Sequence, residues 1–335
     1  MSPKDTSSSA HERLFIIDTD TGADDVSAII IAAKTPGVKV LGVTTLPGNV
    51  TLQQGTKNAL MALELAGSDA PVYPGSEVTY EGVHREVSSI MGSDAMSDLD
   101  LIHPTRQAMD TPAVDFILET IAAHPYEVEI LAIGPATNIA YALDQDEETM
   151  KKVKRIWSMG TAGTGPGNAT PVAEFNVFVD PLAYKRMLDS GIPITIISLD
   201  SASEDAWLTH VQFEHLRPFG GICEFTALSF TVMRDFYKAN GSDRTPNFDG
   251  IAAMCALYPD FVLATESCHG ECITDEGVCY GQVVFFKEGF TYDFPTEDYD
   301  YNVELVRAVD AKNFFDALLH IMRGMRPKPF GSLAR

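Results

Sequence analysis

Short apolar runs alternate with amphipathic segments along most of this chain. The runs have the length of single buried strands, and they fall at 14–17, 38–45, 128–134, 155–160 and 192–198. The segments between them repeat their apolar positions at helical spacing, most clearly at 26–33, 51–66 and 137–143. Strands that alternate with helices form largely parallel sheets, so we expect an α/β fold with an open, mostly parallel, Rossmann-like sheet flanked by helices.

No internal repeat and no long linker interrupts this pattern, which predicts one domain over 13–335. The polar start predicts a disordered N-terminal tail at 1–12. Residues 205–335 should add mostly helices and a hairpin. Residues 76–110 are rich in Met, Ser, Asp and His and predict a long irregular connection, of the kind that often covers a site.

The turn between the first predicted strand and its helix carries unusual chemistry. The segment LFIIDTDTGADDVSAIII places Asp18, Asp20, Asp24 and Asp25 around Gly22. Ligands of open α/β sheets bind at the carboxyl ends of the strands, so these carboxylates should converge there. A helix cap would explain one aspartate, whereas four are explained better by a hard cation with oxygen ligands, such as calcium or magnesium.

Later strand ends supply a second set of polar residues. Asn49 follows the second strand, and a glycine-rich segment presents Asn168, Glu174 and Asn176. Amides and carboxylates hydrogen-bond well to sugar hydroxyls. Asp249 begins another apolar helix, where it would by itself be read as a cap.

Composition narrows the classes of partner. The net charge of −23 opposes binding to nucleic acid, because phosphates would be repelled, but it leaves small neutral substrates open. No apolar run is long enough for a membrane span and no signal-peptide core is present, which predicts a cytoplasmic protein. Five cysteines suggest reduced thiols. Zinc is disfavoured at the local cluster because paired CxxC motifs are missing; the cluster comprises Cys268, His269, Cys272 and Cys279.

Four motifs in order carry a family resemblance. They are DTDTGADD at 18–25, TTLPGN at 44–49, IGPATNIA at 133–140 and GNATPVAEFNVFVDP at 167–181. From residue 14 to about 325 the chain resembles the calcium-dependent nucleoside hydrolases of the inosine-uridine-preferring superfamily. This resemblance implies hydrolysis of the N-glycosidic bond of ribonucleosides to ribose and free base, by a homodimer or homotetramer.

The resemblance also implies a role for each site residue. Calcium would be held by the side chains of Asp20, Asp25 and Asp249 and by the backbone carbonyl of Ile133. Asp20 would also take the proton from a water that calcium orients. The remaining roles concern the sugar: Asp24 and Asn49 would bind the 2′ and 3′ hydroxyls, Asn168, Glu174 and Asn176 would bind the rest of the ribose, and Met159 would line its ring face.

One position departs from the family pattern. Members that cleave both inosine and uridine carry a histidine before the last metal-binding aspartate, where this chain has Phe248. Purine-preferring relatives place an aromatic residue there, so Phe248 could stack on a purine together with a second aromatic residue from the 76–110 connection. This substitution predicts a preference for purine nucleosides. Other candidates for the missing acid are His84, His103 and Tyr237, and a core position for Phe248 is the simpler alternative.

Two other functions fit part of the pattern. A haloacid-dehalogenase-like phosphatase also has an apolar strand ending in DxD, but Gly22 stands where that family has Thr or Val, and 167–176 would be unexplained. A non-catalytic nucleoside-binding protein could keep the ribose-binding residues without the acid. The complete set of carboxylates favours hydrolysis.

Overall fold

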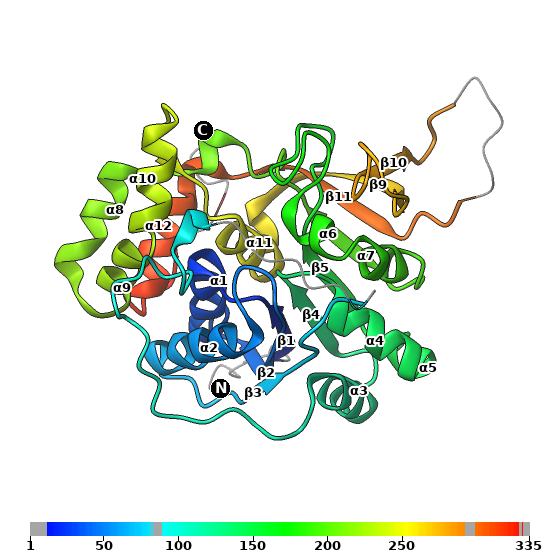
Figure 1. Ribbon diagram of the computed structural model, residues 1–335, viewed down its shortest axis with the longest axis horizontal. Helices are drawn as coiled ribbons and strands as arrows, with labels where there is room; N and C mark the ends of the chain where they lie inside the picture. Colours follow the sequence, from blue (N-terminus) through cyan, green and yellow to red (C-terminus); the bar gives the residue numbers. More distant parts are fainter. Residues whose placement is uncertain (1–11, 81, 83–88, 292–298, 328–329, 331–335) are drawn as a thin grey trace, which may run out of the picture.

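A computed structural model describes residues 12–80, 82, 89–291, 299–327 and 330 (Figure 1). Its strands are β1 (Arg13–Thr19), β2 (Val38–Thr45), β3 (Val72–Pro74), β4 (Val128–Ala132), β5 (Arg155–Met159), β6 (Ile194–Ile197), β7 (Leu208–Thr209), β8 (Arg244–Thr245), β9 (Val262–Cys272), β10 (Val283–Lys287) and β11 (Val303–Val309). Its α-helices are α1 (Ala23–Lys34), α2 (Leu52–Ala66), α3 (Ala113–Ala123), α4 (Thr137–Gln145), α5 (Glu147–Met150), α6 (Phe175–Val179), α7 (Pro181–Leu188), α8 (His210–Leu216), α9 (Gly221–Ser229), α10 (Thr231–Ala239), α11 (Phe248–Leu257) and α12 (Ala311–Met322).

Within these residues, nine strands form one sheet in the order β10-β9-β11-β6-β5-β4-β1-β2-β3. All neighbouring pairs are parallel except those that β9 makes with β10 and β11. The predicted mostly parallel α/β sheet is therefore confirmed. The strand order reverses between β1 and β4, and ligands of such sheets bind at this reversal, beyond the carboxyl ends of the strands.

The last third of the chain differs partly from expectation. The expected helices and the hairpin, β9–β10, are present. However, β11 pairs with β6, so this region also extends the main sheet. The apolar pattern did not predict this pairing, because the pairing joins β11 to a strand more than a hundred residues earlier in the chain.

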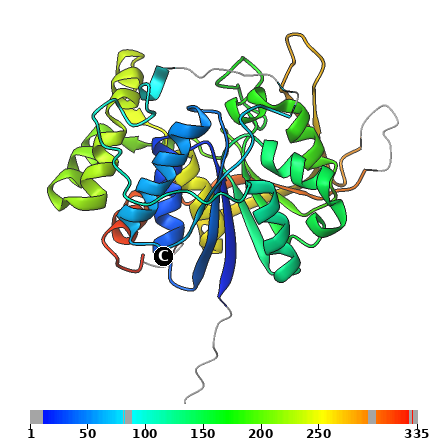
Figure 2. The same ribbon diagram turned by 60° about the horizontal axis from the view of Figure 1, so that its bottom comes forward.

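Helices cover the sheet on both faces (Figure 2). Side chains alternate along β1, so Phe15 and Ile17 pack with α1, α2 and α11 on one face, while Ile16 packs with α3, α4 and α7 on the other. Helices α8, α9, α10 and α12 gather at the left of Figure 1. No described helix has the length and apolar character that a membrane crossing requires.

The 76–110 connection contains the short 3₁₀ helix η1 (Ser89–Met91) and no strand among its described residues. This helix packs against α10, on the side of the molecule where α1 and α11 begin. The predicted tail at 1–12 falls almost entirely outside the described residues, and the single-domain assignment stays a prediction.

Candidate active site

The turn after β1 holds its aspartates in different surroundings. Asp18 still belongs to β1, and one of its carboxylate oxygens accepts hydrogen bonds from Thr44 Oγ1 at 2.6 Å and Asn138 Nδ2 at 2.8 Å. Burial raises the pKa of Asp18 to about 6, although these two hydrogen bonds lower it. Among the described residues, Asp24, Asp25 and Asp249 form a group of close metal-ligating side chains to which neither Asp18 nor Asp20 belongs, so the expected convergence of all four aspartates is only partly met.

Asp25 lies in the first turn of α1 and is held from three sides. It accepts hydrogen bonds from Thr19 Oγ1 at 2.5 Å, from the backbone N–H of Gly22 at 2.8 Å and from Asn49 Nδ2 at 3.3 Å. The bond to Gly22 is one half of a capping box, which satisfies a backbone donor at the start of the helix. These three hydrogen bonds fix the orientation of the Asp25 carboxylate.

Asp20 is fully buried between two other strand ends. Its Oδ2 accepts a hydrogen bond from the backbone N–H of Asn49 at 2.6 Å, and its Oδ1 has no hydrogen-bond partner. A Cβ on Gly48 would lie 2.1 Å from Asp20 Oδ2, and one on Gly134 would lie 3.0 Å from Oδ1. Both glycines are needed because the turns after β2 and β4 approach this carboxylate so closely.

A second helix brings another carboxylate to the same place. Asp249 lies in the first turn of α11, and oxygens of Asp24, Asp25 and Asp249 all lie within 4.8 Å of one another. We call these three residues the aspartate cluster. It is the only group of three or more metal-ligating side chains of this kind among the described residues.

The ionisation of the buried aspartates is strongly perturbed. Burial first, and then the neighbouring carboxylates, hold the pKa values of Asp20 and Asp249 well above their usual range. Burial also raises the pKa of Asp24 to about 7 and of Asp25 to about 6. Asp24 Oδ1 is buried without a hydrogen-bond partner, as is Asp20 Oδ1. Bare carboxylate oxygens crowded together in this way are the ligands that a hard cation prefers.

A cavity of about 400 Å³ opens over the aspartate cluster and is large enough for a small ligand. Two kinds of residue line it. The polar ones are Asp24, Asn49, Asn168, Glu174, Asn176 and Asp249, and the other lining residues include Ile90, Met91, Ile133, Met159, Phe175, Phe178, Met233, Phe236, Tyr237, Pro246 and Phe248. The cavity thus combines hydrogen-bonding groups with aromatic and sulfur-containing side chains. Asp20 and Asp25 do not line it.

Glu174 and Asn176 come from the start of α6. Glu174 is buried and accepts hydrogen bonds from the backbone N–H groups of Asn176, Val177 and Thr161, at 2.8, 3.2 and 3.3 Å. Burial raises its pKa to about 7, although these donors lower it. Asn176 Nδ2 donates to the carbonyl of Ile133 at 3.1 Å. It therefore connects the end of β4 to the cavity wall.

Asn168 and Met159 complete the predicted sugar-binding set. Asn168 is exposed, and its Oδ1 accepts a hydrogen bond from the backbone N–H of Phe175 at 2.9 Å. Met159 is buried at the end of β5, with its sulfur 3.5 Å from Asn176 Nδ2. Every predicted binding residue thus lines the cavity, whereas two predicted metal ligands, Asp20 and Asp25, lie outside its lining.

Phe248 is half-buried and lies at the cavity wall. Its ring is nearly perpendicular to that of Trp207, and the two ring centroids are 5.9 Å apart. The second aromatic residue that was expected from the 76–110 connection is not found in the cavity lining among the described residues. Among its described residues that connection contributes Ile90 and Met91, while Phe236 and Tyr237 come from α10. Of α10, only Tyr237 was connected with the site from the sequence, as an alternative acid, and Phe236 was missed.

The three alternative candidates for the acid differ in their position relative to the cavity. Tyr237 lines the cavity. His103 does not; its ring nitrogen lies 2.8 Å from the carbonyl of Asp100. His84 lies outside the described residues. Of the two described candidates, only Tyr237 is therefore placed to meet a ligand.

Known proteins resemble this chain over most of its length. Residues 15–316 match the family model described as inosine-uridine preferring nucleoside hydrolase. Uridine nucleosidase 1 of Arabidopsis thaliana is 34% identical over 284 residues, which cover 82% of each protein.

Solved structures agree with the sequence relatives. A plant nucleoside hydrolase, the PpNRh1 enzyme, has a TM-score of 0.86 at 28% identity, and the match covers 93% of this chain and 99% of that one. The purine-preferring ribonucleoside hydrolase from Gardnerella vaginalis has a TM-score of 0.85 at 27% identity and covers 93% of this chain and 98% of its own. These similar proteins thus include one named for uridine and one named for purine nucleosides.

Proposed function

Because the chain belongs to the inosine-uridine preferring nucleoside hydrolase family, we propose that its cavity binds a ribonucleoside and hydrolyses the N-glycosidic bond, with purine nucleosides preferred. The observation that carries this proposal is the aspartate cluster beneath a cavity lined by both sugar-binding amides and aromatic rings. Hydrolysis requires a water on one face of the anomeric carbon and a leaving base that is stabilised on the other.

A calcium ion fits the donor set of this site. Asp20, Asp25 and Asp249, with the carbonyl of Ile133, would hold it. In support, all three of these carboxylates are buried, and oxygens of Asp25 and Asp249 lie within 4.8 Å of each other. Bound calcium would orient and partly acidify the attacking water.

Asp20 is the residue we assign as general base. Its carboxylate is fixed by the backbone N–H of Asn49 through one oxygen, which leaves Oδ1 for a proton. Burial first, and then the charge of Asp25, raises the pKa of Asp20 in the metal-free protein. Proton transfer to Asp20 leaves hydroxide to attack the sugar, and the negative charge around it favours the positive charge that develops on the ribose.

The sugar is the part of the substrate with the largest set of candidate partners. We assign Asp24 and Asn49 to the 2′ and 3′ hydroxyls. The rest of the ribose, including its 5′ hydroxyl, is assigned to Asn168, Glu174 and Asn176. Met159 lines the ring face. These residues lie at or after the ends of three strands, β1, β2 and β5, and they line one cavity, which would hold the anomeric carbon in a fixed position.

The base would lie against aromatic side chains. Phe248 and Phe236 are both at the cavity wall, and no described histidine lines it. A purine has a larger ring face for stacking than a pyrimidine, and it can accept a proton from solvent on its imidazole ring. Both properties favour purines for this chain, although the Arabidopsis relative is named for uridine.

The reading as a haloacid-dehalogenase-like phosphatase finds no support in the family match. Homodimer or homotetramer assembly and cytoplasmic location stay predictions. Light scattering measures the first, and fractionation of cells that express the protein measures the second.

Release of reducing sugar tests the proposed reaction. The purified protein with calcium is incubated with inosine, adenosine, guanosine and uridine, and ribose and free base are measured. We expect both products in equal amounts, fastest from a purine nucleoside. Binding of nucleosides without release of ribose would support the non-catalytic alternative and contradict the proposal.

A further inference from the structure

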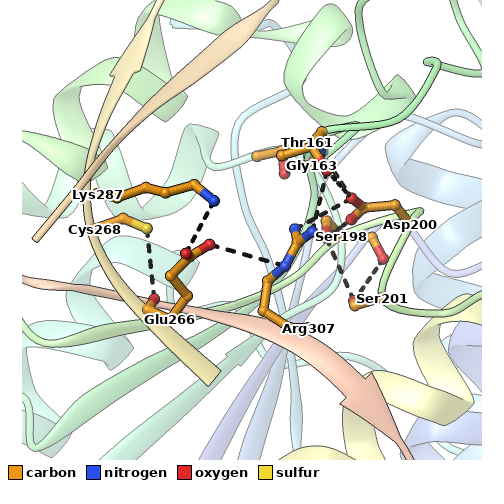
Figure 3. A network of polar contacts seen from close by, with 10 residues as sticks. Thr161, Gly163, Ser198, Asp200, Ser201, Glu266, Cys268, Lys287 and Arg307 are labelled. Atoms are coloured by element: carbon orange, nitrogen blue, oxygen red, sulfur yellow. Dashed lines mark hydrogen bonds and ion pairs between the residues drawn. The ribbon is translucent and has the colours of Figure 1, made fainter. Parts of the chain in front are cut away.

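Outside the cavity lining, Asp200 is the centre of a network of polar contacts just beyond β6 (Figure 3). Its Oδ2 accepts hydrogen bonds from the backbone N–H of Thr164 at 2.9 Å and from Thr164 Oγ1 at 2.7 Å. Its Oδ1 accepts one from Ser198 Oγ at 2.6 Å. Two of these bonds therefore attach the carboxylate to a loop that comes from a different strand.

That loop, residues 160–174, connects β5 to α6 and contains Asn168 and Glu174 of the cavity wall. It passes so close to Asp200 that a Cβ on Gly163 would lie 1.9 Å from Asp200 Oδ1. Gly163 also has a φ of +71°, in the left-handed region that favours glycine. The loop is thus shaped to place Thr164 on the carboxylate.

The same loop carries local strain next to Glu174. Thr161 has a φ of +72°, an unfavourable conformation for a β-branched residue. It is held there by three contacts: its N–H donates to Glu174, its carbonyl accepts from the N–H of Leu199, and its Oγ1 accepts from the N–H of Gly163. A strained residue persists where its surroundings fix it, and here one of the fixing groups is the cavity carboxylate itself.

Arg307 of β11 completes the network from the outer strands. Its guanidinium donates to Asp200 Oδ2 at 3.3 Å and to Thr164 Oγ1 at 3.2 Å. On its other side it faces Glu266 of β9, at 3.9 Å. Burial raises the pKa of Asp200, but the hydrogen bonds from Ser198 and Thr164 and the charge of Arg307 outweigh it and hold the pKa below its usual value. Asp200 is therefore charged at neutral pH, and hydrogen bonds to a charged acceptor are the stronger kind.

We propose that Asp200 is a positioning residue that fixes the 160–174 loop so that Asn168 and Glu174 meet the 5′ end of the sugar. This inference rests on the proposed function. Asp200 touches no substrate in this account and acts through Thr164 and Thr161. Its loss should therefore weaken one part of substrate recognition and leave the aspartate cluster unchanged.

A substrate cycle separates this role from a general loss of structure. Asp200→Ala is compared with the wild type on inosine and on 5′-deoxyinosine, which lacks the hydroxyl that the loop would bind. We expect kcat/KM for inosine to fall by about 10-fold or more and kcat/KM for 5′-deoxyinosine by less than about 3-fold, because the second substrate has already lost that contact. If the enzyme prefers uridine, uridine and 5′-deoxyuridine replace this pair.

Three further variants serve as controls. Glu266→Ala removes a carboxylate of the same network whose ion pairs are with Lys287 and Arg307 and not with the loop, and it should change kcat/KM for both substrates equally and by little. Asp200→Asn keeps an oxygen that can accept the hydrogen bonds from Thr164. Its ratio of kcat/KM for inosine to kcat/KM for 5′-deoxyinosine should therefore be closer to that of the wild type than the ratio of Asp200→Ala. Thr164→Val removes the hydroxyl alone, and it tests the same contact if Asp200→Ala does not fold.

The outcomes are distinguishable. Equal losses on both substrates, no loss, or equal effects of Asp200→Ala and Glu266→Ala would overturn the positioning role while leaving hydrolysis intact. Calcium affinity measured by calorimetry should stay unchanged in Asp200→Ala. A wild-type protein that releases ribose from no nucleoside would overturn the proposed function, and this inference with it.

Discussion

Asp25, at the start of α1, and Asp249, at the start of α11, place carboxylate oxygens within 4.8 Å of each other, although their helices lie far apart in the sequence. Both are buried, and the two helices pack side by side. Two buried negative charges repel each other strongly unless a proton or a cation lies between them. The positive ends of the two helix dipoles reduce this repulsion but do not remove it. The pair is thus arranged for a cation.

Loss of one member of this pair should weaken calcium binding. We expect Asp249→Asn to lower calcium affinity by at least about 10-fold, because even residues behind the ligands of metal sites cost 10–100-fold when changed. Calorimetric titration of the metal-free protein measures this. Asp310→Asn, which removes one negative charge outside the aspartate cluster, is the matched control and should change affinity little. Equal affinities for the wild type and Asp249→Asn would place the ion elsewhere.

Substitution of Asp20 tests the assignment of the base. Asp20→Asn keeps the shape of the side chain and its acceptor for the N–H of Asn49 but cannot take a proton at the same position. We expect kcat to fall by at least about 100-fold, the low end of general-base contributions. The rate is measured at a calcium concentration that saturates the variant, as shown by calorimetry. A variant that binds calcium and keeps near wild-type turnover would show that another residue is the base.

Glu174 should make the stability of the protein depend on pH. Its pKa is about 7 in the folded protein, against an ordinary value of 4.5. The protonated form is favoured in the folded state, so its contribution to stability is complete below about pH 4.5 and is lost as the pH rises through about 7. Glu174→Gln does not titrate. Its stability relative to the wild type should therefore increase from pH 5.5 to pH 8, by an amount on the order of 2 kcal/mol.

Urea unfolding of the metal-free proteins at both pH values measures this difference. Glu129→Gln is the control. Burial raises the pKa of Glu129, but hydrogen bonds and charge from Arg13 outweigh it and lower the pKa. The difference in stability between Glu129→Gln and the wild type should therefore be the same at pH 5.5 and pH 8. A Glu174→Gln difference that is the same at both pH values would mean that Glu174 is ionised throughout.

The base preference should depend on Phe248. With a stacked purine and no described histidine at the cavity, we expect kcat/KM for inosine or guanosine to exceed that for uridine by roughly 10-fold, equivalent to about 1.4 kcal/mol. Phe248→Ala should reduce this ratio, and Phe248→Tyr, which keeps the ring, should retain it. Steady-state kinetics on the three nucleosides give the ratio. Equal efficiencies in the wild type, unchanged by Phe248→Ala, would return Phe248 to a packing role.

The sequence predicted the parts of this site that are local. The segment from Asp18 to Asp25 runs from the end of β1 into α1, and strand periodicity with a glycine and four carboxylates is enough to locate it. Asp249 was different. Its local pattern alone predicted a helix cap, whereas the N-cap of α11 is Asn247. Only the resemblance joined Asp249 to the first turn, because no local pattern reports the packing of α11 on α1.

The features that the sequence missed depend on contacts between distant segments. Phe236 reaches the cavity because α10 packs beside η1, and β11 extends the sheet because it pairs with β6. Asp200 followed a predicted strand, but its proposed role depends on contacts with a loop that begins forty residues earlier in the chain. Such contacts are set by tertiary packing, and hydrophobic periodicity carries no information about them.

The central claim is that hydrolysis requires a metal ion bound at the aspartate cluster. The most direct test is release of ribose from inosine by protein that has been freed of metal and checked for residual calcium, before and after calcium is returned. We predict no release above background without metal, recovery with calcium, and poorer recovery with zinc, because the donor set is oxygen only. Full activity of the verified calcium-free protein would contradict the account.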